Sequence, residues 1–126
     1  MNRPATIDKL RRLHEQAVKI IEREHTNGIE IDEVAALLST SRRQLQRAFV
    51  EFGGVTYRQH VTEVRMRHAA RLLADRSLTI GAITERVGYR QQSQFSKSFR
   101  ARYGILPSAY RRALASTPPT SPSPGS

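Results

Sequence analysis

The chain contains no cysteine and no tryptophan among its 126 residues, and only 6% of its residues are aromatic. The absence of cysteine excludes disulfides, thiolate metal sites and thiol nucleophiles. The scarcity of aromatic residues, combined with many Arg, Leu and Ala, favours helices over a β-sandwich or a barrel. We therefore predict a fold without any sheet.

Long hydrophobic runs are also absent. No apolar stretch approaches the roughly 20 residues that a bilayer-spanning helix needs, and the first twelve residues have no hydrophobic signal core. We expect a soluble, non-exported, cytoplasmic protein without a membrane partner. The four histidines, His14, His25, His60 and His68, show no metal-binding spacing, and we expect them on different helices or faces. We predict no catalytic residue, no metal, no cofactor and no enzymatic activity.

Positive charge is abundant and unevenly distributed. The formal net charge is +10, with six Lys and Arg against seven Asp and Glu in residues 1–38, and fifteen against four in residues 39–126. Such a surplus indicates a polyanionic partner. Nucleic acid is favoured over a membrane because the basic residues are spread over several short predicted helices instead of one strongly amphipathic helix.

Apolar spacing of three and four residues predicts helices throughout the chain. Ser41, Thr56 and Thr79 are suitable N-caps, and Gly53-Gly54 and Gly104 are suitable helix stops. The expected helices are a first one that follows Thr6 and ends near Asn27, then 31–38, 42–52, 56–74, 80–87, 91–102 and 107–113. The predicted fold class is all-α with about seven helices.

The two halves of the chain repeat one another. Ile31, Val34 and Leu38 match Ile80, Ile83 and Val87 at an offset of 49. Leu45, Arg47, Phe49 and Gly54 match Phe95, Lys97, Phe99 and Gly104 at an offset of 50. The change of one residue falls inside a turn, where an insertion is easily tolerated. We predict two helix-turn-helix units, 31–54 and 79–104, joined by a linker helix over 56–74.

The second helix of each unit has an apolar inner face and a polar outer face. Arginine can bind guanine O6 and N7 through two hydrogen bonds, and glutamine can do the same with adenine. The outward candidates for base reading are Arg43, Gln46, Arg47, Gln92, Gln94 and Lys97. Two alternatives stay open: these are solvated helix residues, or the chain is a non-specific nucleic-acid-binding or protein-interaction module whose basic helices coat phosphate.

The second half of the chain closely resembles the C-terminal signature of AraC/XylS-type transcription regulators. The resemblance rests on Val87-Gly88-Tyr89, the run from Ser93 to Arg100, Tyr103-Gly104, Pro107-Ser108 and Tyr110-Arg111. It extends upstream through Val34-Ala35, Leu37-Leu38, Ser41, Leu45, Phe49, Gly54, Arg65-Met66 and Leu72-Leu73, and covers about residues 15–112. It implies a sequence-specific transcription regulator with two homeodomain-like helix-turn-helix subdomains on a rigid linker helix.

In that family the two recognition helices, here about 42–52 and 91–102, enter successive major-groove segments of double-stranded DNA. A linker helix of roughly 27 Å is compatible with grooves ~34 Å apart. The resemblance places base reading on Arg43, Gln46, Arg47, Gln92, Ser93 and Lys97, with Gln94 nearby. Candidates for contacts with the DNA backbone are Ser41, Arg42, Arg90, Gln91, Ser98 and Arg100.

This chain departs from the family pattern at three positions. Ser39 stands where the first turn often has glycine, Thr84 where the second unit usually has alanine, and His60 where the second unit has Tyr110. Thr84 adds a hydroxyl group to a tight helix contact, which raises a question about packing more than about function.

The two ends of the chain lie outside the resemblance. We expect residues 1–14 to be a helical extension, either the remnant of an interdomain linker or a small dimer contact, and 114–126, rich in Pro, Ser and Thr, to be a disordered tail. The resemblance further implies RNA polymerase as a partner, a monomer or weak homodimer, an effector or dimerisation domain missing from this chain, and association with a bacterial nucleoid.

Overall fold

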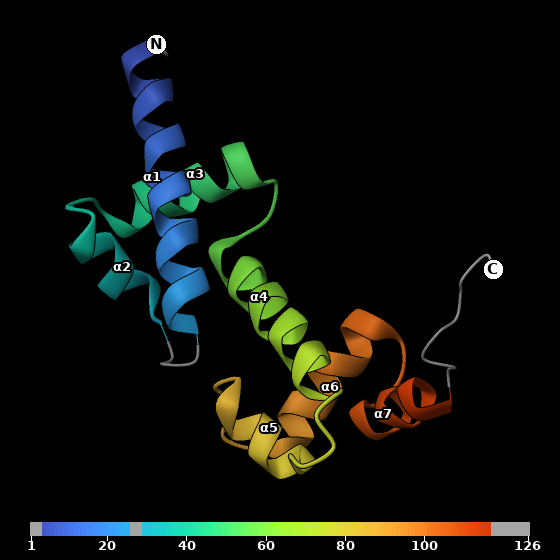
Figure 1. Ribbon diagram of the computed structural model, residues 1–126. Coiled ribbons are helices and arrows are strands. Elements are labelled where there is room, and N and C mark those ends of the chain that lie inside the picture. The colour runs from blue at the N-terminus through green and yellow to red at the C-terminus, as the bar shows by residue number, and fades with distance from the viewer. Residues whose placement is uncertain (1–3, 26–28, 117–126) are drawn as a thin grey trace, which may run out of the picture. The chain divides into compact units, whose positions relative to one another are not determined.

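The computed structural model describes residues 4–25 and 29–116 of the chain (Figure 1). These residues form seven α-helices and no strand, so the predicted all-α fold is confirmed. The helices are α1 (Pro4–Glu24), α2 (Ile31–Leu37), α3 (Arg42–Gly53), α4 (Tyr57–Leu72), α5 (Ile80–Arg86), α6 (Gln92–Tyr103) and α7 (Pro107–Ser116). Within the described ranges, none of these helices has the length and apolar character needed to cross a bilayer.

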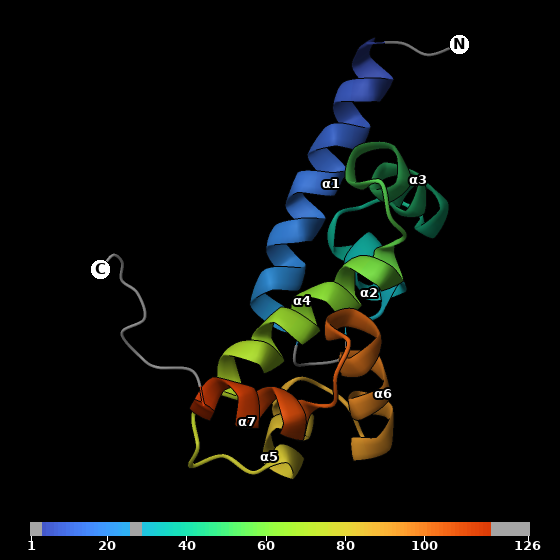
Figure 2. The same cartoon turned by 90° about the vertical axis from the view of Figure 1, so that its right-hand side faces the viewer.

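The chain divides into two compact units between Arg65 and Met66, which is inside α4. The first unit has a core that contains Phe49 and takes Tyr57, Val61 and Val64 from α4. The second unit, in which α5, α6 and α7 follow α4 (Figure 2), has a core that contains Phe95 and Phe99 and takes Met66, Ala69 and Leu73. One helix therefore supplies apolar side chains to both cores.

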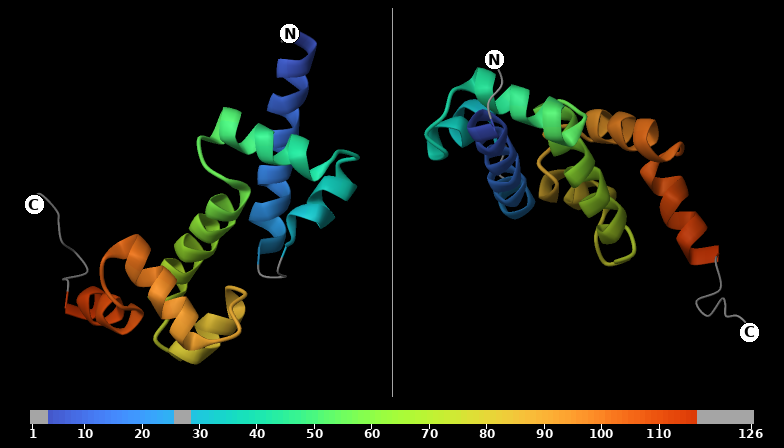
Figure 3. Two further views of the ribbon diagram at one scale, coloured as in Figure 1. Left: turned by 180° about the vertical axis from the view of Figure 1, so that it is seen from behind. Right: turned by 90° about the horizontal axis from the view of Figure 1, so that it is seen from above.

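In the first unit α1 lies across α3 (Figures 1 and 3). Leu10 and Leu13 are buried against Ala48 of α3, and Phe52 packs against the same cluster. Helix α1 continues without a break past residue 14, so the expected boundary of the N-terminal extension falls inside a helix. The first fourteen residues of the chain therefore include side chains that support α3.

The close approach of α1 to the end of α3 requires a glycine. A Cβ atom at Gly53 would lie 2.8 Å from Nε2 of His14, closer than real side chains come. The next residue, Gly54, ends α3 with a φ of 73°, a left-handed conformation that costs a residue with a side chain about 1–2 kcal/mol. Two adjacent glycines thus satisfy two separate needs.

Side-chain caps fix where three of the helices begin. Ser41 accepts a hydrogen bond from the Gln44 amide at 3.1 Å, and Thr79 accepts one from the Ala82 amide at 3.0 Å. Thr56 and Gln59 form a reciprocal pair, in which the Thr56 hydroxyl accepts from the Gln59 amide and the Gln59 side chain accepts from the Thr56 amide. Such caps satisfy amides that have no partner within the helix.

The repeat expected from the sequence is present in the backbone. In the first turn Ser39 and Thr40 donate to the carbonyls of Ala36 and Ala35, at 3.1 and 2.9 Å. In the second turn the residues 49 positions later, Gly88 and Tyr89, donate to Glu85 and Thr84, both at 3.0 Å. The amides of Leu45 and Phe95, 50 positions apart, then bond to Ser41 and Gln91. The extra residue of the second turn is therefore Arg90.

Each core is organised around an aromatic ring of its second helix. The rings of Phe49 and His60 meet edge to face at 5.4 Å between centroids, and those of Phe99 and Tyr110 do so at 5.3 Å. His60 thus takes the structural place of Tyr110, as the sequence match predicts. His14 also packs on Phe49, at 4.9 Å, and its ring lies 6.4 Å from that of His60, so these two histidines are on different helices, as expected, and are still in ring contact.

Thr84 is accommodated without a buried unpaired hydroxyl. Thr84 is buried, and its Oγ1 donates to the Ile80 carbonyl one turn earlier at 2.9 Å. A threonine hydroxyl that bonds back to its own helix needs no partner from the neighbouring helix. The hydroxyl group that Thr84 adds relative to the family's alanine is therefore hydrogen-bonded within α5 itself.

Candidate nucleic-acid interface

Helix α3 presents a polar face opposite its buried one. Leu45, Ala48 and Phe49 are buried, whereas the predicted base-reading residues Arg43, Gln46 and Arg47 are all exposed. Within the described residues, the side chains of Arg43 and Arg47 form no ion pair, so their guanidinium groups are available to an external acceptor. Three candidate side chains are thus accessible on one recognition helix.

Helix α6 presents a corresponding face. Phe95 and Phe99 are buried, and the outer face carries Ser93, Gln94 and Lys97, all of which are exposed. Lys97 occupies the register position of Arg47, 50 residues earlier. Gln92 is also exposed, but its Oε1 lies 3.7 Å from the Cβ position of Gly81 at the start of α5.

Arg42, predicted to contact the DNA backbone, has a partner inside the protein. Its Nε and Nη2 donate to the two carboxylate oxygens of Asp32 at 2.8 and 2.5 Å. The bond from Arg42 lowers the pKa of Asp32, and Asp32 raises the pKa of Arg42. Any phosphate contact by Arg42 therefore has to share or displace this carboxylate.

The remaining backbone candidates differ in accessibility. Arg90, Gln91 and Arg100 are exposed, and Ser98 is half-buried. Ser41 is exposed, but its hydroxyl oxygen already accepts the capping bond at the start of α3. Gln91 holds the equivalent position before α6 without a capping bond from its side chain.

Val50 belongs to the outer face of α3 but is not among the residues predicted from the sequence to contact DNA. It lies three residues after Arg47, has a side chain that is 57% exposed, and stands 50 positions before Arg100. A cavity of about 270 Å³ beside it is also lined by Gln46 and Arg58. The repeat offset could have identified Val50, whose apolar side chain is suited to contact a thymine methyl group.

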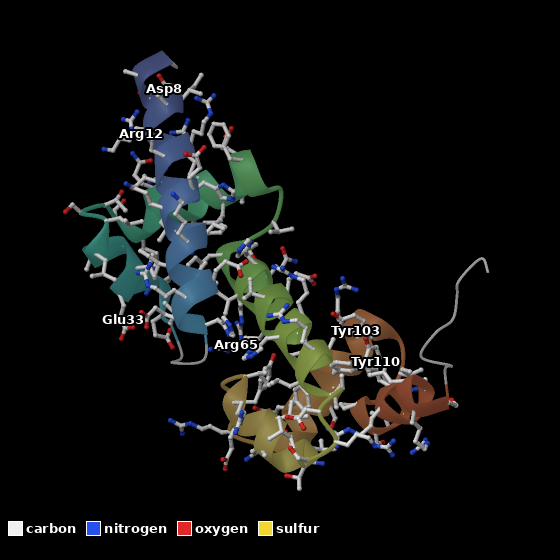
Figure 4. All side chains as sticks on the ribbon, in the orientation of Figure 1. Asp8, Arg12, Glu33, Arg65, Tyr103 and Tyr110 are labelled. Atoms are coloured by element: carbon white, nitrogen blue, oxygen red, sulfur yellow. The ribbon has the colours of Figure 1, made fainter. Side chains whose placement is uncertain are left out.

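Aromatic stacking holds α6 and α7 together within the second unit. Tyr103 and Tyr110 face each other in Figure 4, with ring centroids 5.6 Å apart, and both rings pack on Phe99. Arg65, also labelled in Figure 4, donates from Nε to the His25 carbonyl at 3.0 Å and so ties α4 to the end of α1. Helix α6 is therefore supported by rings of its own unit, as α3 is by Leu10 and Leu13 of α1.

Charge differs sharply between the units. Residues 1–65 carry eleven Lys and Arg against nine Asp and Glu, a net +2, and residues 66–126 carry ten against two, a net +8. Since non-specific attraction to DNA scales with the number of phosphates that cations neutralise, the second unit supplies most of the basic surplus for it.

Comparison with known proteins finds helix-turn-helix proteins, in agreement with the two helix-turn-helix units described above. A family model described as "Helix-turn-helix domain" matches residues 34–113. The probable transcription factor PqrA of Proteus vulgaris is 30% identical over 88 residues, which are 70% of this chain and 72% of that protein.

Solved structures show the same fold. A transcriptional regulator from Chromobacterium violaceum, titled as AraC-type DNA-binding domain-containing, has a TM-score of 0.77 at 28% identity, and the match covers 82% of this chain and 93% of that chain. The DNA-binding domain of AdpA in complex with a target DNA has a TM-score of 0.73 at 28% identity and covers 81% and 91%. The chain spans about a third of the length of the first curated relatives it matches.

Proposed function

We propose that this chain, which belongs to the AraC-type helix-turn-helix transcription regulators, a non-enzymatic family, reads a specific duplex DNA site. In this proposal α3 and α6 enter successive major-groove segments of a promoter. The observation that carries this proposal is the matched pair of exposed polar faces. Arg43 and Arg47 on α3 stand in the same register as Ser93 and Lys97 on α6.

The proposal assigns roles by chemistry. Arg43, Gln46 and Arg47 read bases for the first unit, and Ser93, Gln94 and Lys97 do so for the second, where Gln92 lies nearer α5. Arg90, Gln91 and Arg100 contact phosphates beside α6. The AdpA domain was solved with its target DNA, which supports DNA as the ligand of this domain type. RNA polymerase as a partner, a monomeric or weakly dimeric state, and an effector domain elsewhere belong to the same proposal.

A direct test begins with selection of bound fragments from random duplex DNA. We expect an asymmetric consensus site of about two helical turns. Arg47→Ala and Lys97→Ala should each weaken binding to that site by ~1–3 kcal/mol, because each removes a base contact in the major groove. Fluorescence anisotropy on the selected site and on random duplex of equal length measures both affinities.

The matched control is Arg12→Ala. Arg12 is exposed on α1 (Figure 4), a helix that carries none of the predicted DNA-contacting residues, so its loss removes the same charge without removing a candidate contact. Arg47→Ala and Lys97→Ala should affect random duplex no more than Arg12→Ala does. Selection that returns no consensus, or equal losses on both duplexes, would favour the second candidate function, non-specific coating of phosphate, for which the net +8 of residues 66–126 is the supporting observation.

A further inference from the structure

A cavity in the second unit is lined by three arginines and by no acidic side chain. Its volume is about 630 Å³, and Arg76, Arg111 and Arg112 lie on its wall with Ile80 and Ser108. Arg76 follows α4, Ile80 begins α5, and the other three belong to α7. None of these residues is on α3 or α6 or among the residues proposed to contact DNA.

Arg111 is fixed in place by the backbone. Its Nε donates to the Leu73 carbonyl and its Nη2 to the Asp75 carbonyl, both at 3.0 Å. These bonds tie α7 to the segment that follows α4 and hold the guanidinium group at the cavity wall. Its remaining donors are not used by described residues, so the cavity has one preorganised cation.

Arg76 and Arg112 have no side-chain partner among the described residues. The nearby carboxylate of Asp75 accepts hydrogen bonds from the amide and the hydroxyl of Ser77, at 3.0 and 2.6 Å, and these bonds lower the pKa of Asp75. The charges of Arg86 and Arg111 lower this pKa further, so the Asp75 carboxylate offsets part of the charge of Arg111. Arg76 and Arg112 are the two cations of the cavity without an ion pair to a described residue. Three like charges around one cavity repel each other, and a bound anion would relieve that repulsion.

The cavity also has an apolar part. Ile80 and Ala115 contribute to its wall, and a second cavity of about 360 Å³, lined in part by Leu73 and Leu114, shares Arg76 and Arg111 with it. Apolar surface beside cations suits an organic anion better than a hydrated inorganic one.

We propose that this cavity binds a phosphate monoester or diester, with the phosphoryl oxygens held by Arg76, Arg112 and the fixed Arg111. The planar guanidinium group matches phosphate through paired hydrogen bonds, which makes arginine well suited to this task. The same phosphate chemistry can come from two sources: a free small organic phosphate, or a phosphate of the DNA backbone beyond the base-reading helices.

The test uses the full chain and two probes. Phenyl phosphate, titrated at constant ionic strength and followed by calorimetry and by amide NMR shifts, tests the free source. The salt dependence of binding to random duplex DNA tests the backbone source. The variants are Arg76→Gln and Arg112→Gln. The matched control is Arg71→Gln, because Arg71 is an exposed arginine of the same unit that does not line the cavity.

We expect phenyl phosphate to bind saturably and to shift the amides of Ile80 and Ser108. Arg76→Gln and Arg112→Gln should weaken binding about tenfold, as expected for the loss of a hydrogen bond between charged groups, and Arg71→Gln should leave it unchanged. If the source is the DNA backbone, the same two variants reduce the slope of log K against log salt by about 0.9 per lost contact.

A selective loss in the phenyl phosphate arm alone assigns the cavity to small phosphates, and a selective loss in the DNA arm assigns it to the backbone. The proposal is overturned if Arg76→Gln and Arg112→Gln behave like Arg71→Gln in both arms. Neither arm uses a selected site, so failure of sequence-specific binding and failure of this cavity are distinguishable.

Discussion

The two units share a backbone pattern but differ in charge. The turn hydrogen bonds of the first unit recur 49 residues later and the helix-end bonds 50 residues later, whereas the net charge rises from +2 in residues 1–65 to +8 in residues 66–126. Apolar, turn and capping positions decide the fold of each unit, and the exposed positions vary independently of it. The difference in net charge indicates that the two units contribute unequally to the electrostatic attraction of a polyanion.

Corresponding positions within the units also use different chemistry for one purpose. In the first unit Arg42 at the start of α3 binds Asp32 at the start of α2. The matching residues of the second unit are Gln92 and Gly81, and here an amide oxygen lies over a glycine. Both pairs join the first turn of the recognition helix to the preceding helix. The first unit does so with an ion pair and the second without charge.

The most severe test of this comparison removes the central ring of each core. Phe49→Ala and Phe99→Ala should each cost ~3–5 kcal/mol, because both rings are fully buried and their removal leaves a cavity. Denaturant unfolding measures the cost, and amide hydrogen exchange locates it. We expect each variant to lose protection mainly in its own unit. Equal loss in both units from either variant would mean that the division between Arg65 and Met66 has no energetic counterpart.

Exchanging the turn residues tests whether the two turns are equivalent. Ser39 has a φ of 55° and Gly88 a φ of 91°. Gly88→Ser should destabilise the protein by about 1–2 kcal/mol, since a side chain is unfavourable in that conformation. Ser39→Gly should gain less, because glycine raises the entropy of the unfolded chain by about 0.4–1 kcal/mol. Thermal unfolding of both variants measures the two changes in stability. A stability gain from Ser39→Gly that is larger than the loss from Gly88→Ser would contradict the prediction.

Acid sensitivity should distinguish the first unit, because two histidines, His14 and His60, pack on its central ring, Phe49. Burial of His14 lowers its pKa, and Glu15 opposes this to a lesser extent. A histidine with a lowered folded pKa contributes stability above its unfolded pKa of about 6.5, and this contribution is lost as the pH falls from that value through the lowered pKa of the folded state. Thermal unfolding between pH 7.5 and 5 should therefore show a smaller acid loss for His14→Gln than for the natural chain. An unchanged loss would place the sensitivity at other groups.

The smallest effect concerns Asp32. Asp32→Asn removes the carboxylate that holds Arg42, and we expect the released guanidinium group to reach a DNA phosphate. The slope of log K against log salt should then steepen by about 0.9, the value for one additional phosphate contact. Glu33→Gln is the matched control, because Glu33 is the exposed neighbouring acid on α2 (Figure 4). Equal slopes for both variants would show that Arg42 stays where it is.

The elements of the fold were predictable because their signals are local. The caps at Ser41, Thr56 and Thr79 and the glycine after α3 mark helix ends through bonds between near neighbours in sequence. The closing helix extends further than expected, to Ser116, because nothing in its last turn forces a stop. The rest of the predicted disordered tail lies outside the described residues.

Contacts between distant residues could not be predicted in the same way. The pair Asp32 and Arg42 depends on how the turn aims α3, and the meeting of His14 with His60 depends on the packing of α1. The apolar spacing of the first helix predicts that Leu10 and Leu13 are buried, but their partner on α3 could not be predicted because the resemblance to the family begins near residue 15. The predicted outer faces of α3 and α6 are exposed, and their part in reading bases stays a prediction.

The position of α4 has a consequence for how the protein folds. The 16 residues of this helix supply three buried side chains to the first core and two, Met66 and Ala69, to the second, and the division between the units falls near its middle. The severed pieces, nine and seven residues long, would be marginal helices in water, where about 12–15 residues are needed even for favourable sequences. Neither unit is therefore a separable module at that division. Formation of α4 should therefore lower the cost of folding for both units.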